Sequence, residues 1–325
     1  MMAPSRHVRT ERPLDGPFPV LLADITALNG VFSDAFTERY RRDGMVGVRV
    51  PFLNPLIWRY AIEDAGTGAM LWRDERGEIA AFNVAHMSGT EGWMGPLAAR
   101  PDLQGAGIGK QIVTAGIEWL RAHGATTIGL ETMPRTLDNI GFYARLGFTP
   151  GTLTLTLTLE AQAAERSPLL LGALTPTDRA AMVVACRDLA QRVLPGYDFT
   201  REIELTDQLA AGDTVLLLDD GLLVGWALCH TAPLVEGRPR EELRVLKLVL
   251  ADEGAMPRMG LVLADYARRS GARRVAIRVQ GSFPGVFRAL VSQGARVRWS
   301  DLRMTLDGTP ERHPERGVLL SNWEI

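Results

Sequence analysis

The residues that decide the fold are Arg100-Pro101-Asp102-Leu103-Gln104-Gly105-Ala106-Gly107-Ile108-Gly109-Lys110, which join an apolar strand to a long amphipathic helix. Three glycines at alternate positions, followed by a lysine, permit positive φ angles and let a ligand approach the backbone closely. The first N–H groups of a helix are unpaired and lie at the positive end of its dipole. A tight turn without a ligand is the structural alternative, but the pattern favours a phosphate-binding loop.

Two familiar phosphate motifs do not fit this loop. A P-loop would need Gly at 104 and Ser or Thr at 111, where the chain has Gln104 and Gln111. A dinucleotide fingerprint that starts at Gly105 ends on Lys110 instead of a glycine. Glu131 stands about where a ribose-binding acid would, so a dinucleotide-binding oxidoreductase remains a minor alternative that titration with NADH would test.

The chain contains an internal repeat of domain size. His123-Gly124-Ala125-Thr126-Thr127-Ile128-Gly129-Leu130 resembles Ser270-Gly271-Ala272-Arg273-Arg274-Val275-Ala276-Ile277, which lies 147 residues further on. The same offset pairs Gly147 with Gly294 without a gap. Each copy has the pattern of an amphipathic helix, a Gly-Ala turn, an apolar strand, a helix, a glycine and a final strand. Strands that alternate with helices predict an α/β (α+β) layer structure, here two domains of one fold.

We expect three parts: residues 1–13 as a flexible tail, residues 14–162 as the N-terminal domain and residues 163–325 as the C-terminal domain. Alternating Thr and Leu from 152 to 159 predict a strand that closes the first domain. Thr175-Pro176-Thr177-Asp178 is a helix-start signal in the second. Within the first domain the pattern also predicts strands near 18–22, 69–73, 78–86, 92–99 and 126–133, and helices near 25–42, 56–64, 107–123 and 138–146.

Composition argues against several classes of protein. Of the 325 residues, 46% are apolar and 23% charged, and 36 basic residues against 38 acidic ones give a net charge of −2. A protein that coats nucleic acid needs a basic surface, so we expect no nucleic-acid partner. The two cysteines and five histidines show no metal-ligand pairing, so we expect no metal site. Because no apolar run is long enough to cross a membrane and no export signal is evident, we expect a cytoplasmic protein with no membrane partner.

Two segments of the first copy occur together at an informative spacing. Gln104-Gly105-Ala106-Gly107-Ile108-Gly109 follows the apolar stretch Leu97-Ala98-Ala99-Arg100-Pro101, and Asn139-Ile140-Gly141-Phe142-Tyr143-Ala144-Arg145-Leu146-Gly147-Phe148 comes one helix and one strand later. They resemble, in order, the [QR]-x-x-G-x-[GA] loop with its leading strand and the N…FY…LGF segment of the GCN5-related N-acetyltransferase (GNAT) superfamily. The resemblance covers roughly residues 17–160 and identifies the chain as a tandem-domain member with a degenerate second domain.

The resemblance implies a fold and a ligand. Each half would be a mixed, mostly antiparallel central sheet flanked by helices, in which two parallel strands splay apart to admit acetyl-CoA, the co-substrate. The amides of Leu97 and Ala99 would bind the thioester carbonyl and pantetheine, as fixed donors for the oxyanion that develops in acyl transfer. The CoA pyrophosphate would bind the loop residues Gln104, Gly105, Ala106, Gly107, Ile108, Gly109 and Lys110.

The resemblance also implies roles in chemistry. Tyr143 occupies the family's general-acid position, from which a phenolic proton can pass to the thiolate leaving group. Asn139 lies four residues earlier on the same helix face and either binds pantetheine or caps the helix. The attacking amine must be neutral, and Glu131 or Glu91, on strands expected to line the cleft, could accept its proton through water or be structural acids. His86 is a third candidate, more typical of a structural histidine.

The second copy lacks the loop's chemistry. At the same offset, Asp252 and Glu253 fall inside the loop and would repel a pyrophosphate, and Pro257 removes an N–H group. We therefore predict that the second domain does not bind CoA in the family's manner. It is expected to cover an edge of the first domain, to shape the acceptor pocket or lend Trp299 or Trp323 to it, or only to add stability.

The leading hypothesis is an acetyl-CoA-dependent N-acetyltransferase that acts directly on a primary amine of a small molecule or peptide. A non-catalytic module that binds acyl-CoA as a sensor or regulator is the alternative, and CoA release across a panel of amines separates the two. The oligomeric state, monomer or homodimer, is left open. Candidates for the acceptor pocket on the entry helices are Tyr40, Arg41, Arg42, Phe52 and Trp58.

Overall fold

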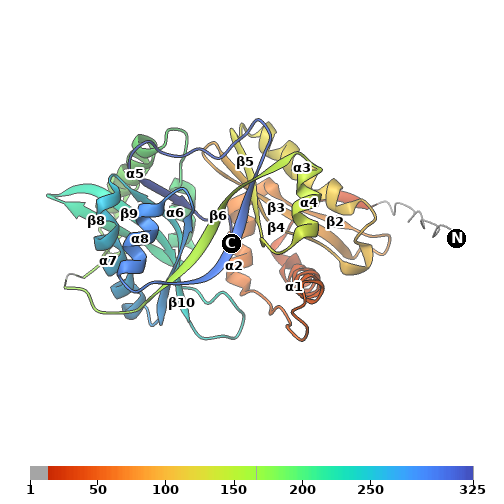
Figure 1. Ribbon diagram of the computed structural model, residues 1–325, viewed down its shortest axis with the longest axis horizontal. Coiled ribbons are helices and arrows are strands. Elements are labelled where there is room, and N and C mark those ends of the chain that lie inside the picture. Colours follow the sequence, from red (N-terminus) through yellow and green to blue (C-terminus); the bar gives the residue numbers. More distant parts are fainter. Residues whose placement is uncertain (1–13, 166, 325) are drawn as a thin grey trace, which may run out of the picture.

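The structure is a computed structural model that describes residues 14–165 and 167–324. The N-terminal and C-terminal halves of the chain lie side by side, and one mixed sheet runs through both, with helices packed on it (Figure 1). Among the described residues, no helix is long and apolar enough to cross a membrane. The predicted flexible tail, residues 1–13, lies outside the described residues.

The N-terminal half follows the predicted order of elements. Its strands are β1 (Asp15–Pro19), β2 (Ala69–Arg73), β3 (Ile79–Ser88), β4 (Glu91–Ala99), β5 (Thr127–Thr132) and β6 (Phe148–Glu160), and its helices are α1 (Ile25–Arg42), α2 (Pro55–Ala65), α3 (Ile108–Ala122) and α4 (Leu137–Ala144). The first strand lies at 15–19 rather than 18–22. The Leu21 N–H donates to the Asp24 carboxylate (2.9 Å), which turns the chain into α1 and leaves Leu21 exposed.

The C-terminal half repeats this order. Its strands are β7 (Leu169–Leu170), β8 (Gly212–Asp219), β9 (Leu222–His230), β10 (Glu242–Leu250), β11 (Arg274–Gln280), β12 (Arg296–Leu306) and β13 (Val318–Ser321), and its helices are α5 (Pro176–Val193), α6 (Thr200–Gln208), α7 (Met256–Arg269) and α8 (Pro284–Ser292). Thr175 caps α5 as predicted: its hydroxyl accepts the Asp178 N–H (3.2 Å), and Pro176 occupies the first helical position.

The strand order shows that the two halves exchange strands. The sheet runs β1-β2-β3-β4-β5-β12-β6-β11-β10-β9-β8-β7, with β13 paired to β10. Strand β12 of the C-terminal half therefore lies between β5 and β6, and β6 pairs on its other side with β11. In Figure 1 the long strands β6 and β12 cross between the halves. The two tandem folds thus share one sheet, and β12 covers the β5 edge of the first.

The 147-residue repeat takes the form of a local two-fold symmetry in this pairing. Thr154 of β6 lies opposite Asp301 of β12. Asp301 is also the residue that the 147-residue offset makes equivalent to Thr154, so the symmetry axis passes through this pair. Close to the axis, Glu131 and its equivalent Arg278 reach across and form an ion pair. The two copies of one position have thus diverged to opposite charges that meet.

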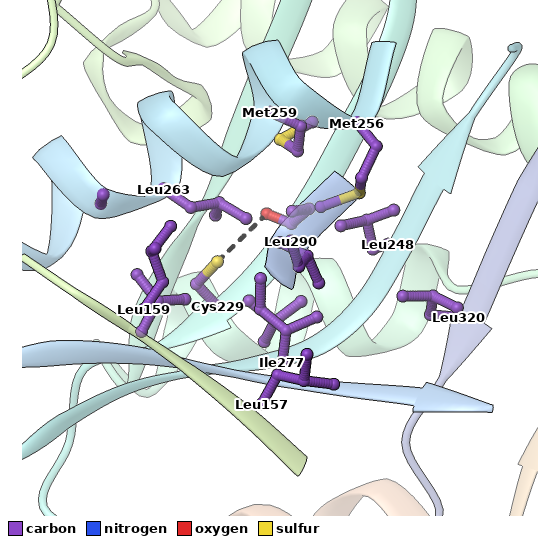
Figure 2. Close-up of a cluster of buried hydrophobic side chains, with 14 of the residues drawn as sticks. Leu157, Leu159, Cys229, Leu248, Met256, Met259, Leu263, Ile277, Leu290 and Leu320 are labelled. Carbon is purple, nitrogen blue, oxygen red and sulfur yellow. Dashed lines mark hydrogen bonds between the residues drawn. The ribbon is translucent and has the colours of Figure 1, made fainter. Parts of the chain in front are cut away.

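The exchanged strands also join the apolar cores. Leu157 and Leu159 of β6 pack in the core of the C-terminal half, with Ile277 of β11 (Figure 2). Leu320 of β13 and Leu248 of β10 belong to the same cluster. Each fully buried leucine contributes about 1.5–3 kcal/mol. The strand that ends the first copy therefore helps to stabilise the second.

Candidate active site

Strands β4 and β5 diverge part-way along their length. They pair in parallel only as far as Met94 and Leu130. On the other side of β4, the pairing with β3 shifts register between Asn83 and Ala85, at the same level. Residues 95–99 of β4 keep only β3 as a neighbour among the described strands, because β5 continues beside β12. We call this open edge the β4/β5 gap.

The main chain of β4 presents two N–H groups to this gap. The Arg100 N–H donates to the Ala80 carbonyl (2.9 Å), so Arg100 faces β3. In an antiparallel ladder, N–H and C=O groups of alternate residues face the same neighbour. The N–H groups of Leu97 and Ala99 therefore face away from β3 and into the gap. Both predicted amide donors therefore point into the gap.

The loop after β4 carries a run of unpaired N–H groups. Gly105 and Gly107 have φ of +84° and +85°, which favours glycine at both positions. Within the described chain, the N–H groups from 105 to 110 find no hydrogen-bond acceptor, and the first such bond of α3 runs from Gln111 to the Gly107 carbonyl (3.2 Å). A run of free amides at a helix start is a site for an anion.

The side chains of the loop have separate tasks. The Gln104 amide donates to the Ala99 carbonyl (3.1 Å), so this side chain braces the loop against β4. Ile108 is buried in the core, which leaves only its backbone, like that of Ala106, for a ligand. Lys110 is exposed and can place its ammonium beside a phosphate.

Helix α4 closes the other side of the site. A Cβ on Gly109 would lie 3.1 Å from the Phe142 ring, so glycine here lets the first turn of α3 approach α4. Tyr143 is buried, with its ring 6.0 Å from that of Phe148. Burial raises the pKa of Tyr143 to about 12, so its hydroxyl keeps a proton near neutral pH and suits an acid better than a base. The N-cap of α4 is Thr136, which leaves the half-buried Asn139 inside the first turn.

Comparison with known proteins agrees with this geometry. Residues 33–148, which include the loop, the divergent strands and Tyr143, match the model of the acetyltransferase (GNAT) family. The matched stretch is 116 of the 325 residues, and within it the chain is similar to a family of acetyltransferases. No curated protein is significantly similar to the chain in sequence.

Solved structures share the tandem fold at low sequence identity. A putative acetyltransferase from Pyrococcus horikoshii has 15% identity and a TM-score of 0.68, with 99% of this chain and 98% of that chain covered. A tandem GNAT protein from the clavulanic acid biosynthesis pathway has 15% identity and a TM-score of 0.60, covering 92% and 100%. A GCN5-related N-acetyltransferase from Sphaerobacter thermophilus has 16% identity and a TM-score of 0.59, covering 91% and 96%. The likeness shows that both halves have the GNAT fold.

Glu131, one predicted base, lies in a buried ion cluster. Its carboxylate pairs with Arg278 and with Arg303 (2.8 Å to Nε), and accepts the Thr154 hydroxyl (2.6 Å). Burial alone would raise the pKa of Glu131, but the two guanidinium groups lower it to about 2. Both carboxylate oxygens are engaged by these partners, close to the symmetry axis. The Glu131 side chain is therefore suited to joining the halves and poorly placed to take a proton from a substrate.

Glu91, the other predicted base, is also occupied. It is buried at the start of β4, where it accepts the Ser321 hydroxyl (2.6 Å) and the Trp323 indole N–H (2.8 Å). Lys247 approaches the same carboxylate at 4.0 Å. All three partners come from the C-terminal half. The acid therefore anchors the segment 321–324 to the N-terminal half, and its geometry argues for a structural role.

His86 supports the point where the strands diverge. Its Nδ1 lies 2.6 Å from the Asp64 carboxylate, its Nε2 lies 3.2 Å from the Gly95 carbonyl, and its ring stacks on Trp93 at 4.0 Å. These contacts fix β4 at the start of the gap and agree with the structural interpretation of this histidine.

The predicted acceptor residues divide into two groups. Trp58 is fully buried and donates to Asn29 (2.7 Å), and Arg41 and Arg42 pair with Glu38 on the exposed face of α1, so these three do not line the site. Phe52 lies in the loop between α1 and α2. This loop pairs with the one between β9 and β10, through hydrogen bonds Asn54 N–H to Leu234 O (2.9 Å) and Glu236 N–H to Phe52 O (3.0 Å). The C-terminal half therefore holds the loop between α1 and α2 by main-chain hydrogen bonds.

The second half has a corresponding divergence with a different occupant. Strands β10 and β11 pair in parallel only as far as Arg244 and Ala276. Beyond that point, β13 pairs with β10, from Lys247–Ser321 to Leu250–Val318. We call this place the β10/β11 gap. Strand β13 thus occupies the edge of β10 that corresponds to the open edge of β4. This is a physical reason to expect that the second half does not bind CoA between diverging strands.

The loop of the second half is also altered. Residues 251–255 join β10 to α7, against 100–107 between β4 and α3, so three residues are missing and the 147-residue offset fails within the loop. Asp252 uses its carboxylate to accept the Gly254 N–H (2.7 Å), and Pro257 lies in the first turn of α7. These features reduce the number of N–H groups free for an anion.

Sequence reasoning did not identify that the segment 321–324 reaches the β4/β5 gap. A short stretch such as Val318–Ser321 fits many sheet edges, and its pairing with β10 depends on contacts far apart in the chain.

A hollow of about 590 Å³ lies beside β1 and the turn Asp74–Gly77, away from the divergent strands. We place the site by the main-chain donors instead, because they supply the chemistry.

Proposed function

We propose that this protein transfers an acetyl group from acetyl-CoA directly to a primary amine of a small molecule or peptide. The observation that carries the proposal is the set of main-chain donors: Leu97 and Ala99 face the β4/β5 gap, and the N–H groups from 105 to 110 are free at the start of α3. One set fits a thioester and pantetheine, and the other fits a pyrophosphate.

The donors and charges present suit acetyl-CoA. The loop offers neutral donors, a helix dipole and the exposed Lys110 to a diphosphate. Leu97 is fixed in a strand, so its N–H is aimed before reaction at the oxygen that becomes negative, a contribution of about 10²–10³ in rate for one such donor. Asn139, with no hydrogen bond of its own to other described side chains, is free to contact pantetheine.

The surroundings of the titratable groups support a general acid for the leaving thiolate more clearly than a general base for the amine. Tyr143 keeps its proton and can pass it to sulfur as the carbon–sulfur bond breaks, a step worth about 10²–10⁴ in rate. Glu91 and Glu131 are held in ion pairs and hydrogen bonds, so neither is assigned the amine proton here.

Two measurements test the proposal. Calorimetry should show one acetyl-CoA bound per chain, and a thiol assay should show CoA release with at least one member of a panel of primary amines. Mass spectrometry of the amine should show the added acetyl group. Absence of any heat with CoA or acetyl-CoA would contradict the site itself. Tight binding with no release for any amine would instead support the sensor hypothesis.

A further inference from the structure

A small cleft lies where the two halves meet. It has a volume of about 200 Å³ and is bounded by strands β6, β10, β11 and β12 and by the segment 321–324. Pockets for drug-sized ligands measure roughly 300–1,000 Å³, so this cleft suits a smaller group. Its lining residues include Arg244, Arg278, Trp299 and Glu324.

The segment 321–324 brings this cleft to the start of the β4/β5 gap. Arg303 stacks on the Trp323 ring at 3.9 Å, and a side chain on Gly129 of β5 would collide with that ring. A Cβ on Gly95 would lie 3.4 Å from the main-chain oxygen of Trp323. Trp323 is therefore fixed against both divergent strands. The next residue, Glu324, therefore follows the point at which the chain contacts Gly95, where β4 and β5 part.

Glu324 presents a partly open carboxylate to the cleft. Its Oε2 accepts from Arg278 Nη1 at 2.8 Å, and its N–H donates to the Asn322 side chain at 3.0 Å. The side chain is 48% exposed, whereas those of Glu91 and Glu131 are 1% and 2% exposed. Of these three acids beside the gap, Glu324 is the one that a substrate can reach.

We propose that this cleft binds the amine acceptor and that Glu324 receives its ammonium group and takes up its proton. The inference rests on the proposed function and extends it, because the acceptor site is then completed by the C-terminal half. The recognised class is a primary alkylammonium head group, held by the carboxylate and flanked by the Trp299 ring.

The reaction balances with these groups. Glu324 accepts one proton from the ammonium, and the neutral amine attacks the thioester carbon. The carbon–nitrogen bond forms, the carbon–sulfur bond breaks, and the Tyr143 proton passes to the thiolate. The proton shed by the new amide nitrogen returns to Tyr143 through water. Glu324 then releases the first proton to solvent, and the products are the amide and CoA thiol.

The surroundings of Glu324 favour its protonated form more than water does. Partial loss of hydration raises the pKa of Glu324, Asp301 and Glu131 add to the rise, and Arg278 and Arg244 oppose it. Water in the open cleft screens part of this effect. Among the described residues, the other charged or titratable groups at the cleft are Glu242 on β10, which is paired with Arg274, Tyr40 on α1, and Arg135, whose guanidinium lies 5.5 Å from the centre of the Trp299 ring.

The test compares Glu324→Gln with Glu315→Gln, which changes an exposed acid in the preceding loop. The probe is whichever of n-propylamine, glycinamide, glucosamine, spermidine and dialanine gives the fastest CoA release. Glu324→Gln should lower kcat/KM for that amine by about 10²-fold or more and remove the low-pH limb of its pH profile. CoA affinity should stay within about twofold of the wild type, as should every parameter of the control.

Glu324→Asp provides the second variant. It keeps the charge, so the pH limb should return with part of the rate, which a purely structural role would not produce. Transfer by Glu324→Gln with unchanged kcat/KM and pH profile would overturn this assignment and leave the proposed function intact. Loss of CoA binding in the wild-type protein would instead count against the proposed function.

Discussion

The β4/β5 gap and the β10/β11 gap come from one repeat but have different occupants. In both, two parallel strands pair for a few residues and then diverge. In the first half the freed edge of β4 faces no other described strand, and the loop that follows carries six N–H groups with no acceptor among the described residues. In the second half β13 pairs with the freed edge, and the loop is three residues shorter. One gap is left for a ligand, and the other is filled by protein.

The difference shows how a second copy can serve the first without binding a ligand. Because β13 runs antiparallel to β10, it leads the chain from the loop end of the β10/β11 gap back toward the symmetry axis. The chain then meets Glu91 and β5 through Trp323. Filling the second gap therefore delivers the segment that lies against the first. The following variants are designed to break or sharpen this contrast.

The largest expected effect is on turnover in the open gap. Tyr143→Phe keeps the ring and removes the proton, so kcat should fall by about 10²–10⁴-fold. CoA affinity and stability should barely change, because the ring still packs against Phe148. Tyr266→Phe, at a buried tyrosine of the C-terminal half, is the control and should leave kcat intact. Equal turnover by Tyr143→Phe and the wild type in steady-state kinetics would remove the acid role.

The next effect is on the connection between the halves. Glu131→Gln leaves Arg278 and Arg303 without their shared carboxylate, which should cost about 3–5 kcal/mol of unfolding free energy in denaturant titrations. The pKa of Glu131 is about 2, below the ordinary value of about 4.3. Its contribution is therefore complete above about pH 4.3 and is lost as the pH falls toward 2.

Glu241→Gln is the matched control for this ion pair. It breaks an exposed pair with Arg273 (3.8 Å) and should cost at most about 1 kcal/mol. If Glu131→Gln were as stable as the wild type but inactive, the carboxylate would have a catalytic role and the structural interpretation would be wrong.

A third variant tests the filled gap. Leu320→Ala removes a buried side chain of β13 from the core in Figure 2 and should cost about 2–4 kcal/mol. Calorimetry should still find one CoA per chain, because the shortened loop, with Asp252 and Pro257 in or beside it, still suits a pyrophosphate poorly even if β13 loosens. A second CoA bound to this variant would show that β13 alone blocks the second site.

Local features of the fold could be predicted from the sequence. The bounds of α1, the cap of α5 and the register of the repeat from 123 to 155 all follow from periodicity, capping residues and an ungapped offset. These signals are local or depend on comparing two segments of the chain. The sequence also located the glycine loop and Tyr143, because motif and spacing are themselves sequence features.

The partners of the strands could not be predicted in the same way. The Thr-Leu alternation of β6 specifies which side chains share a face, but it does not specify whether β5 or β12 lies alongside. The ion pair between Glu131 and Arg278 had one signal: opposite charges at equivalent positions, which meet if the axis lies close. Nothing comparable indicated that β13 would fill the second gap or that Trp323 would reach Glu91.

The smallest effect concerns the loop that distinguishes the two gaps. Gly107 has φ of +85° with open space around it, and Gly271 in the second half has φ of +78° with open space too. Valine at either position carries the same backbone strain, about 1–2 kcal/mol. Only Gly107→Val tilts the free N–H groups, so it alone should weaken CoA binding, by about 10–100-fold in calorimetry. If Gly271→Val weakened it equally, general destabilisation and not the loop would be the cause. Unchanged affinity in Gly107→Val would mean that the diphosphate binds elsewhere.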